Sequence, residues 1–188
     1  MQTARAQGAM DRLVALDLAA CRALQHRTGE WMQAAFALVS RLGDGWLWGT
    51  VAVALLLAGG SDAVPTILGM LVAAVAGLPL YVLLKRWMAR PRPCATAGSG
   101  LRPLVPALDR FSFPSGHTLH AVAFTVVVLG RYPGLAWLLV PFTALVALSR
   151  VVLGLHYPSD VMAGAAIGSL LGSLPRMLEA ALAAIFAA

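Results

Sequence analysis

Long apolar runs separated by short polar breaks make up most of the chain, and their lengths predict membrane-spanning helices. The run over 64–84 has the ~20 residues that a helix needs to cross a hydrocarbon core of about 30 Å, and it ends abruptly at Lys85. The run over 31–60 is interrupted at "SRLGDGW". There we expect a short helix to about residue 42, a glycine turn, and a span over about 45–59.

The second half of the chain predicts a helical hairpin followed by a final span. The hairpin arms cover about 114–130 and 134–149, the turn is "GRYPG", and the last span covers about 158–174. We expect the tail "RMLEAALAAIFAA" to form a separate interfacial helix. The fold class that follows is all-α: a polytopic membrane helix bundle with about five to six spanning helices and with interfacial N- and C-terminal helices.

Residues 1–30 are predicted to form an amphipathic helix at the membrane surface. Apolar residues recur at helical spacing over 9–28, with charged residues between them. The apolar face carries Leu13, Leu16, Ala20 and Leu24. Charges at positions 5, 11, 12, 17 and 22 interrupt the apolar core that a cleavable signal peptide needs, so we expect no such signal.

The composition supports a membrane protein and excludes an ordinary soluble enzyme. Of 188 residues, 60% are apolar and only 12% are charged, whereas soluble domains are about half apolar and a quarter charged. The length predicts a single domain over 1–188. The net charge of +6 favours binding to an anionic partner, which could be nucleic acid, anionic lipid or an anionic substrate. We expect no nucleic-acid partner, because the basic residues cluster at the ends of apolar runs.

One long polar segment, 85–113, is rich in Pro, Arg and Gly, and we expect it to be an active-site loop. Counting spans places Lys85, the start of the third span at 114–117, Arg150 and Asp160 at the same membrane face. Three polar patches that are distant in the sequence therefore converge at one surface.

These patches have the residue types of an anion-binding site. "FPSGH" and "YPSD" both read as helix starts, because proline favours the first helical turn. We expect the backbone N–H groups of Ser115 and Gly116 to point out of their helix and bind an anion. Lys85, Arg92 and Arg150 can surround the same anion, and the arginines suit bidentate contacts with phosphate.

The histidines add chemistry to this site. Asp160 can hold one ring nitrogen of His156 and leave the other as a nucleophile, while His117 can act as general acid. Taken singly, the cations could be interfacial anchors and the histidines could be caps or packing residues. Anchoring does not account for all of them together. The sequence has no acidic cluster suited to Mg²⁺ and no CxxC pair, so we expect neither metal nor cofactor.

The spacing of these residues resembles that of the type 2 phosphatidic acid phosphatase family, lipid phosphate phosphatases related in fold to vanadium haloperoxidases. The family pattern is filled over 85–160 by Lys85 with Arg92-Pro93, by Pro114 to His117, and by Ser149-Arg150 with His156 and Asp160. The resemblance implies metal-independent hydrolysis through a phosphohistidine on His156, with His117 as acid and Asp160 orienting the nucleophile. It assigns the phosphate to Lys85, Arg92, Ser115, Gly116 and Arg150.

The resemblance also implies a substrate class. We expect a lipid phosphate or diphosphate in the bilayer, first undecaprenyl pyrophosphate, with phosphatidylglycerophosphate and phosphatidate as alternatives. A lipid phosphotransferase using the same phosphohistidine and a non-catalytic binder of anionic lipid remain further alternatives. By analogy the protein lies in the inner membrane with its site on the periplasmic face, although the positive-inside rule favours the cytoplasm. The sequence leaves the oligomeric state open.

Several other polar and aromatic residues have open roles. We expect His120 to pack or to support the site. Arg90 and Arg102 either line the entrance, where they could meet a second phosphate, or belong to a solvated loop. Asp109 and Arg110 either pair with each other or position the loop. An interfacial aromatic belt is predicted from Trp46, Trp48, Trp87 and Trp137.

Overall fold

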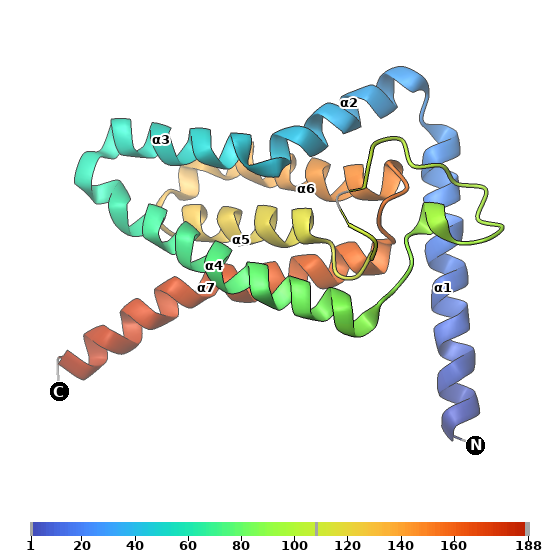
Figure 1. Ribbon diagram of the computed structural model, residues 1–188. Helices are drawn as coiled ribbons and strands as arrows, with labels where there is room; N and C mark the ends of the chain where they lie inside the picture. Colours follow the sequence, from blue (N-terminus) through green and yellow to red (C-terminus); the bar gives the residue numbers. More distant parts are fainter. Residues whose placement is uncertain (1, 108, 187–188) are drawn as a thin grey trace.

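The computed structural model describes residues 2–107 and 109–186, and within them the chain is almost entirely helical, with no β-strand (Figure 1). The predicted all-α class is confirmed. Residues 1, 108, 187 and 188, which belong to the predicted terminal helices and loop, lie outside the described residues. The α-helices are α1 (Gln2–Arg27), α2 (Glu30–Arg41), α3 (Leu47–Gly59), α4 (Val64–Met88), α5 (Gly116–Arg131), α6 (Ala136–Val152) and α7 (Pro158–Phe186).

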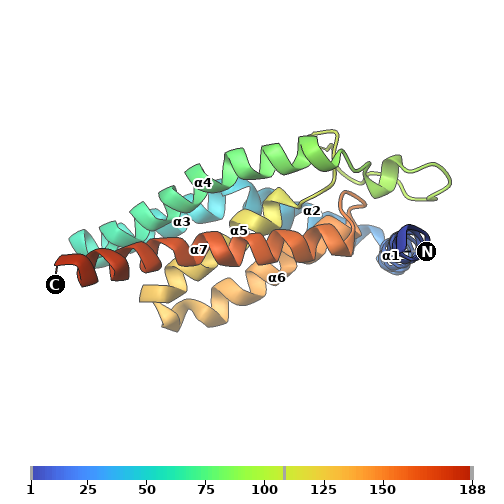
Figure 2. The same ribbon diagram turned by 90° about the horizontal axis from the view of Figure 1, so that it is seen from below.

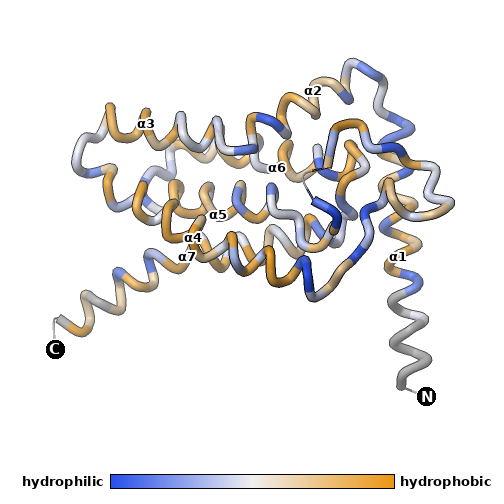
Figure 3. The backbone as a smooth tube through the Cα atoms, viewed as in Figure 1, coloured by the Kyte–Doolittle hydropathy of each residue, from blue (hydrophilic) through white to orange (hydrophobic). Residues whose placement is uncertain are grey.

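Helices α2 to α6 and the first part of α7 form an elongated bundle, and α1 crosses one end of it nearly at right angles (Figures 1 and 2). The loop between α4 and α5 lies at this same end. Hydrophilic residues gather where α4 ends and the loop runs, whereas the rest of the bundle is mostly hydrophobic (Figure 3). Among the described residues, three stretches are long and apolar enough to cross a membrane: Glu30–Met88, Pro133–Val152 and Pro158–Ile185.

Close backbone contact between α5 and α7 fixes the relative positions of the two helix starts that carry motifs. Three glycines of α7, spaced four residues apart, face the backbone of α5. A Cβ atom at Gly164, Gly168 or Gly172 would lie 2.6, 2.3 or 2.5 Å from a carbonyl oxygen of α5 or its N-cap. Small residues permit this approach in membrane bundles. The sequence "PSGH" is therefore held against "YPSD".

The glycine turn expected after residue 42 is confirmed, whereas the expected tail helix is wrong. Helix α2 ends at Arg41 and α3 begins at Leu47, and the segment between them, Leu42–Trp46, is a kink with a non-helical backbone at Gly45 (φ of 124°). At the other end of the chain, α7 continues through Pro175 to Phe186 without a break and leaves the bundle at its far end (Figure 1). Proline inside a helix can kink it without ending it.

The N-terminal helix packs against the rest of the protein through buried Asp17 and Cys21, and Leu24 of the predicted apolar face packs against the cluster around Cys21. Leu13 and Leu16 of the same face are 44% and 69% exposed. These two leucines are free to contact lipid, and the place of the helix at the membrane surface stays a prediction.

The predicted aromatic belt is wrong at one position. Trp46, Trp87 and Trp137 are exposed, but Trp48 is only 3% exposed and packs edge-on against Phe124 and Phe142. Trp48 therefore belongs to the hydrophobic core of the bundle and not to its surface.

Candidate active site

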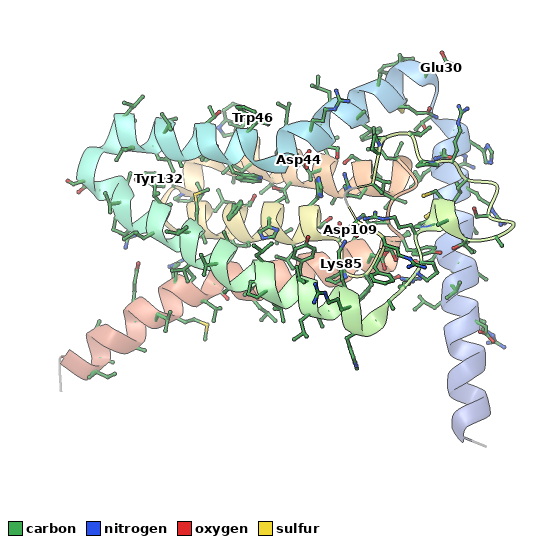
Figure 4. The ribbon with its side chains drawn as sticks, in the orientation of Figure 1. Glu30, Asp44, Trp46, Lys85, Asp109 and Tyr132 are labelled. Atoms are coloured by element: carbon green, nitrogen blue, oxygen red, sulfur yellow. The ribbon has the colours of Figure 1, made fainter. Side chains whose placement is uncertain are left out.

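A cavity of about 390 Å³ opens at the end of the bundle where α4 ends, α5 begins and α6 ends. Its polar wall brings together six of the basic side chains considered above and two acids: Lys85, Arg92, His117, His120, Arg150, His156, Asp44 and Asp109. Its apolar wall includes Trp48, Leu78, Tyr81 and Phe124. Asp44, Lys85 and Asp109 are marked around this end of the bundle in Figure 4. The three sequence-distant patches therefore converge.

The three predicted phosphate-binding cations all reach the cavity. Lys85 comes from the last turn of α4, Arg92 from the loop and Arg150 from the last turn of α6, and all three are nearly buried, at 6%, 4% and 3% exposure. Arg150 donates to the hydroxyl of Ser40 in α2. Buried cations this close together are costly unless anions compensate them.

The two predicted backbone donors differ in position. Gly116 lines the cavity at the first position of α5, and a Cβ atom there would lie 3.3 Å from the ring of Tyr81. Ser115 is wholly buried, its N–H donates to the carbonyl oxygen of Asp160 at 3.1 Å, and its hydroxyl bonds with Thr118 at 3.0 Å. The expectation of a free Ser115 N–H is wrong, because the tight α5–α7 contact uses this donor.

A carboxylate bridges two of the three cations. Asp109 lies 2.6 Å from Lys85 Nζ through Oδ2 and 2.9 Å from Arg92 Nη2 through Oδ1. Burial by itself would raise the pKa of Asp109, but the hydrogen bonds and charges of Lys85 and Arg92 lower it below its ordinary value. Asp109 therefore does not pair with Arg110, as one reading of the sequence had it, and is an ionised anion between two cations predicted to hold phosphate.

His156 lies in the short connection between α6 and α7 with its imidazole edge toward the cavity. Nε2 is 3.4 Å from Arg92 Nη1, and Nδ1 faces Asp160 Oδ2 at 3.7 Å. The carboxylate thus stands on the predicted side of the ring, but beyond hydrogen-bond distance. Burial, assisted by the nearby Arg150 and Arg92 charges, lowers the pKa of His156 to about 4, against the opposing influence of Asp160. The ring is neutral at neutral pH.

Asp160 is held from behind by a network that reaches α1. It is fully buried, and its carboxylate accepts the Tyr157 N–H at 2.9 Å and a hydrogen bond from Arg90 Nη1 at 2.7 Å. Arg90 also pairs with Asp17 of α1 at 2.8 Å. Asp17 in turn accepts the Ser159 N–H at 3.1 Å. Arg90 has neither of the two roles considered from the sequence, entrance lining or a solvated loop, because its charge pairs with two buried carboxylates behind His156.

Arg102 and His120 complete the predicted set. Arg102 is exposed and does not line the cavity. Its carbonyl oxygen accepts a hydrogen bond from Gln25 Nε2 at 2.9 Å. His120 lines the cavity one turn after Gly116, whose carbonyl oxygen lies 2.9 Å from His120 Nδ1. His117 contacts Asp44 through Nε2. Over residues 2–107 and 109–186, no group of three or more His, Cys, Asp or Glu side chains is arranged to hold a metal ion.

The chain belongs to the PAP2 superfamily, because the model of that family matches residues 64–178. It is 33% identical to undecaprenyl-diphosphatase BcrC of Bacillus subtilis over 103 residues, and this aligned stretch covers 55% of this chain and 52% of that protein. It is 39% identical over 95 residues to decaprenylphosphoryl-5-phosphoribose phosphatase of Mycobacterium tuberculosis, which covers 50% and 51%. The chain thus spans about half the length of these curated relatives.

Two solved structures share the fold over most of the chain. LpxE of Aquifex aeolicus superimposes with a TM-score of 0.71 at 26% identity, over 86% of this chain and 95% of that one. A transmembrane PAP2 type phosphatidylglycerolphosphate phosphatase of B. subtilis gives a TM-score of 0.71 at 24% identity, over 89% and 86%. The second likeness is one of fold alone. Together they support the assignment of this bundle as a membrane PAP2 fold.

Proposed function

We propose that the protein, acting as one unit over its 188 residues, is a membrane phosphatase that removes a phosphate from a lipid phosphate or diphosphate. The observation that carries this proposal is the position of His156. Its Nε2 edge faces a cavity that also holds Lys85, Arg92, Arg150 and a second histidine, His117. A nucleophile, an acid and three cations around one space are the parts that phosphoryl transfer needs.

The reaction proceeds in two displacements. The lone pair of neutral His156 attacks the terminal phosphorus, an N–P bond forms, and the P–O bond to the leaving group breaks while His117 protonates the leaving oxygen. The leaving oxygen is the lipid alcohol oxygen in a monophosphate and the bridging oxygen in a diphosphate, from which the lipid monophosphate departs. Water then attacks the phosphohistidine, His117 takes a proton from it, and inorganic phosphate leaves with His156 neutral again. The cations neutralise the phosphoryl oxygens throughout, and the Gly116 N–H adds a backbone donor.

The walls of the cavity favour a substrate that is part anion and part lipid. Leu78, Tyr81 and Phe124 continue from the charged end into the bundle, so the first carbons of a tail can lie beside apolar side chains. We assign undecaprenyl pyrophosphate as the leading substrate, since one similar protein is an undecaprenyl-diphosphatase and another acts on a decaprenylphosphoryl compound by name. We place the protein in the inner membrane with this cavity on the periplasmic face.

A phosphate-release panel tests the proposal. Purified protein in detergent is assayed on undecaprenyl pyrophosphate, phosphatidylglycerophosphate and phosphatidate, with chelator present and with or without added alcohol acceptors. We expect release of free phosphate, fastest from the polyprenyl diphosphate, and none from a His156→Ala variant that elutes and melts like the parent. Transfer of the phosphoryl group to alcohol in place of release would identify a phosphotransferase. Equal release by the His156→Ala variant would refute the proposal.

A further inference from the structure

An acidic residue between α2 and α3, Asp44, lines the active-site cavity although it lies outside the three sequence motifs. Asp44 lies in the kinked segment Leu42–Trp46 between α2 and α3, ahead of the stretch 64–178 that the family model matches. It lines the same cavity as His117, and its Oδ1 contacts His117 Nε2. Within the described part of the chain, this is the one ion pair that Asp44 makes.

The backbone around Asp44 is built to bring it there. The segment Leu42–Trp46 is a kink between α2 and α3 with a non-helical backbone at Gly45, whose φ of 124° other residues rarely adopt. Gly43 seats the segment on α6, since a Cβ atom there would lie 3.0 Å from Val146. Asp44 lies between these two glycines, where its side chain meets His117 at the start of α5.

From this geometry we propose that Asp44 is the positioning residue of the general acid His117. The inference rests on the function proposed above and deepens it. Each of the two histidines assigned to the chemistry then has its own carboxylate: Asp160 stands behind Nδ1 of His156, and Asp44 stands against Nε2 of His117. The second pairing decides which nitrogen of His117 does the chemistry.

The proton inventory is simple. In the charged form, Nε2–H of His117 donates to Asp44, and Nδ1–H is the proton that the leaving oxygen receives. After transfer the ring is neutral and keeps its Nε2–H on Asp44, so the Nδ1 lone pair is free to take a proton from the attacking water. Asp44 itself stays ionised, orients the ring and stabilises its charged form, as the carboxylate does in a catalytic triad.

The alternative is that the Asp44–His117 contact has no effect on proton transfer. Leaving-group dependence separates the two readings, because 4-nitrophenolate departs without a proton and an alkoxide does not. Asp44→Asn keeps the shape and removes the charge. Asp44→Glu keeps the charge, and Asp62→Asn makes the same change at an exposed position in the turn between α3 and α4.

The measurement is kcat/KM for a long-chain alkyl phosphate and for 4-nitrophenyl phosphate, on purified protein in detergent. We expect Asp44→Asn to lose about 10- to 100-fold on the alkyl substrate and much less on the nitrophenyl one. His117→Ala should show the same selective loss, while Asp44→Glu retains more alkyl activity than Asp44→Asn and Asp62→Asn matches the parent. Equal losses on both substrates, or no loss, would overturn the role of Asp44. A parent protein that hydrolyses neither substrate would overturn the proposed function itself.

Discussion

If Lys85 and Arg92 bind phosphate as proposed, the carboxylate of Asp109 competes with the substrate for them, and removing its charge should strengthen phosphate binding. In the structure it bridges Lys85 and Arg92, and its backbone oxygen also accepts a hydrogen bond from Arg92 Nε at 2.9 Å. An incoming phosphate must displace the carboxylate from both cations or share them with it. Asp109→Asn keeps the side-chain shape and the backbone contact but removes the competing charge.

The size of the effect follows from the two contacts. A hydrogen bond to a charged group contributes about 1.5–3 kcal/mol net, and charge accounts for roughly half of that. Asp109 makes two such bonds, to Lys85 at 2.6 Å and to Arg92 at 2.9 Å. The charge of its carboxylate therefore stabilises these contacts by about 1.5–3 kcal/mol relative to the neutral amide of asparagine. Without the charge, phosphate should bind about 10- to 100-fold more tightly, since about 1.4 kcal/mol is a factor of ten.

The assay is competitive inhibition by inorganic phosphate, measured as Ki for the parent and for Asp109→Asn in the same detergent at neutral pH. Asp62→Asn is the matched control, because this residue is exposed in the turn between α3 and α4 at the other end of the bundle. The expected result is a lower Ki in Asp109→Asn alone. An unchanged or higher Ki would show that Asp109 assists phosphate binding or is irrelevant to it, and the reasoning would fail.

Three further predictions follow from the same contacts. Arg90→Gln removes the ion pair that holds buried Asp160 at 2.7 Å, so kcat for phosphate release should fall about 10-fold or more while KM changes little, and an unchanged kcat would exclude this support. Gly168→Ala places a methyl group 2.3 Å from a backbone oxygen of α5 and should lower the free energy of unfolding in detergent by about 1–3 kcal/mol; Gly49→Ala, which meets no atom within 4 Å, should not. Because burial lowers the pKa of His156 to about 4, the neutral nucleophile should persist as the pH falls to about 4, and an acid limb of kcat/KM near the ordinary value of 6.5 would contradict this assignment.

The sequence predicts the bundle and the meeting of its motifs because apolar runs have a nearly fixed length in a membrane. The ends of α4 and α6 and the starts of α5 and α7 must then share a face. This places Lys85, Arg150 and His156 around one cavity before any coordinate is known. The glycine turn at 42–46 is also predicted, because glycines beside two charges interrupt an apolar run there. The boundary at the C-terminal end fails, because α7 continues through Pro175 where the sequence favours a break.

Pairings between distant charges are the part that the sequence does not specify. Asp109, Arg90 and Asp17 all read as loop or surface charges, yet each compensates a buried group of the site. Their ion-pair partners are 17 to 73 positions away, so local spacing carries no information about them. One signal was present in the sequence: Asp17 interrupts an otherwise apolar stretch of α1, where a carboxylate is costly to bury unless it is paired.

Trapping the covalent intermediate tests the central claim most directly. Purified protein is mixed with substrate carrying labelled phosphate and quenched within milliseconds, and the acid-labile phosphoryl group is located by mass spectrometry. The account predicts a phosphoryl group on the imidazole of His156, which lines the cavity beside Arg92. It also predicts that no label is retained by a folded His156→Ala variant. Label on another residue, or label retained by that variant, would contradict the account.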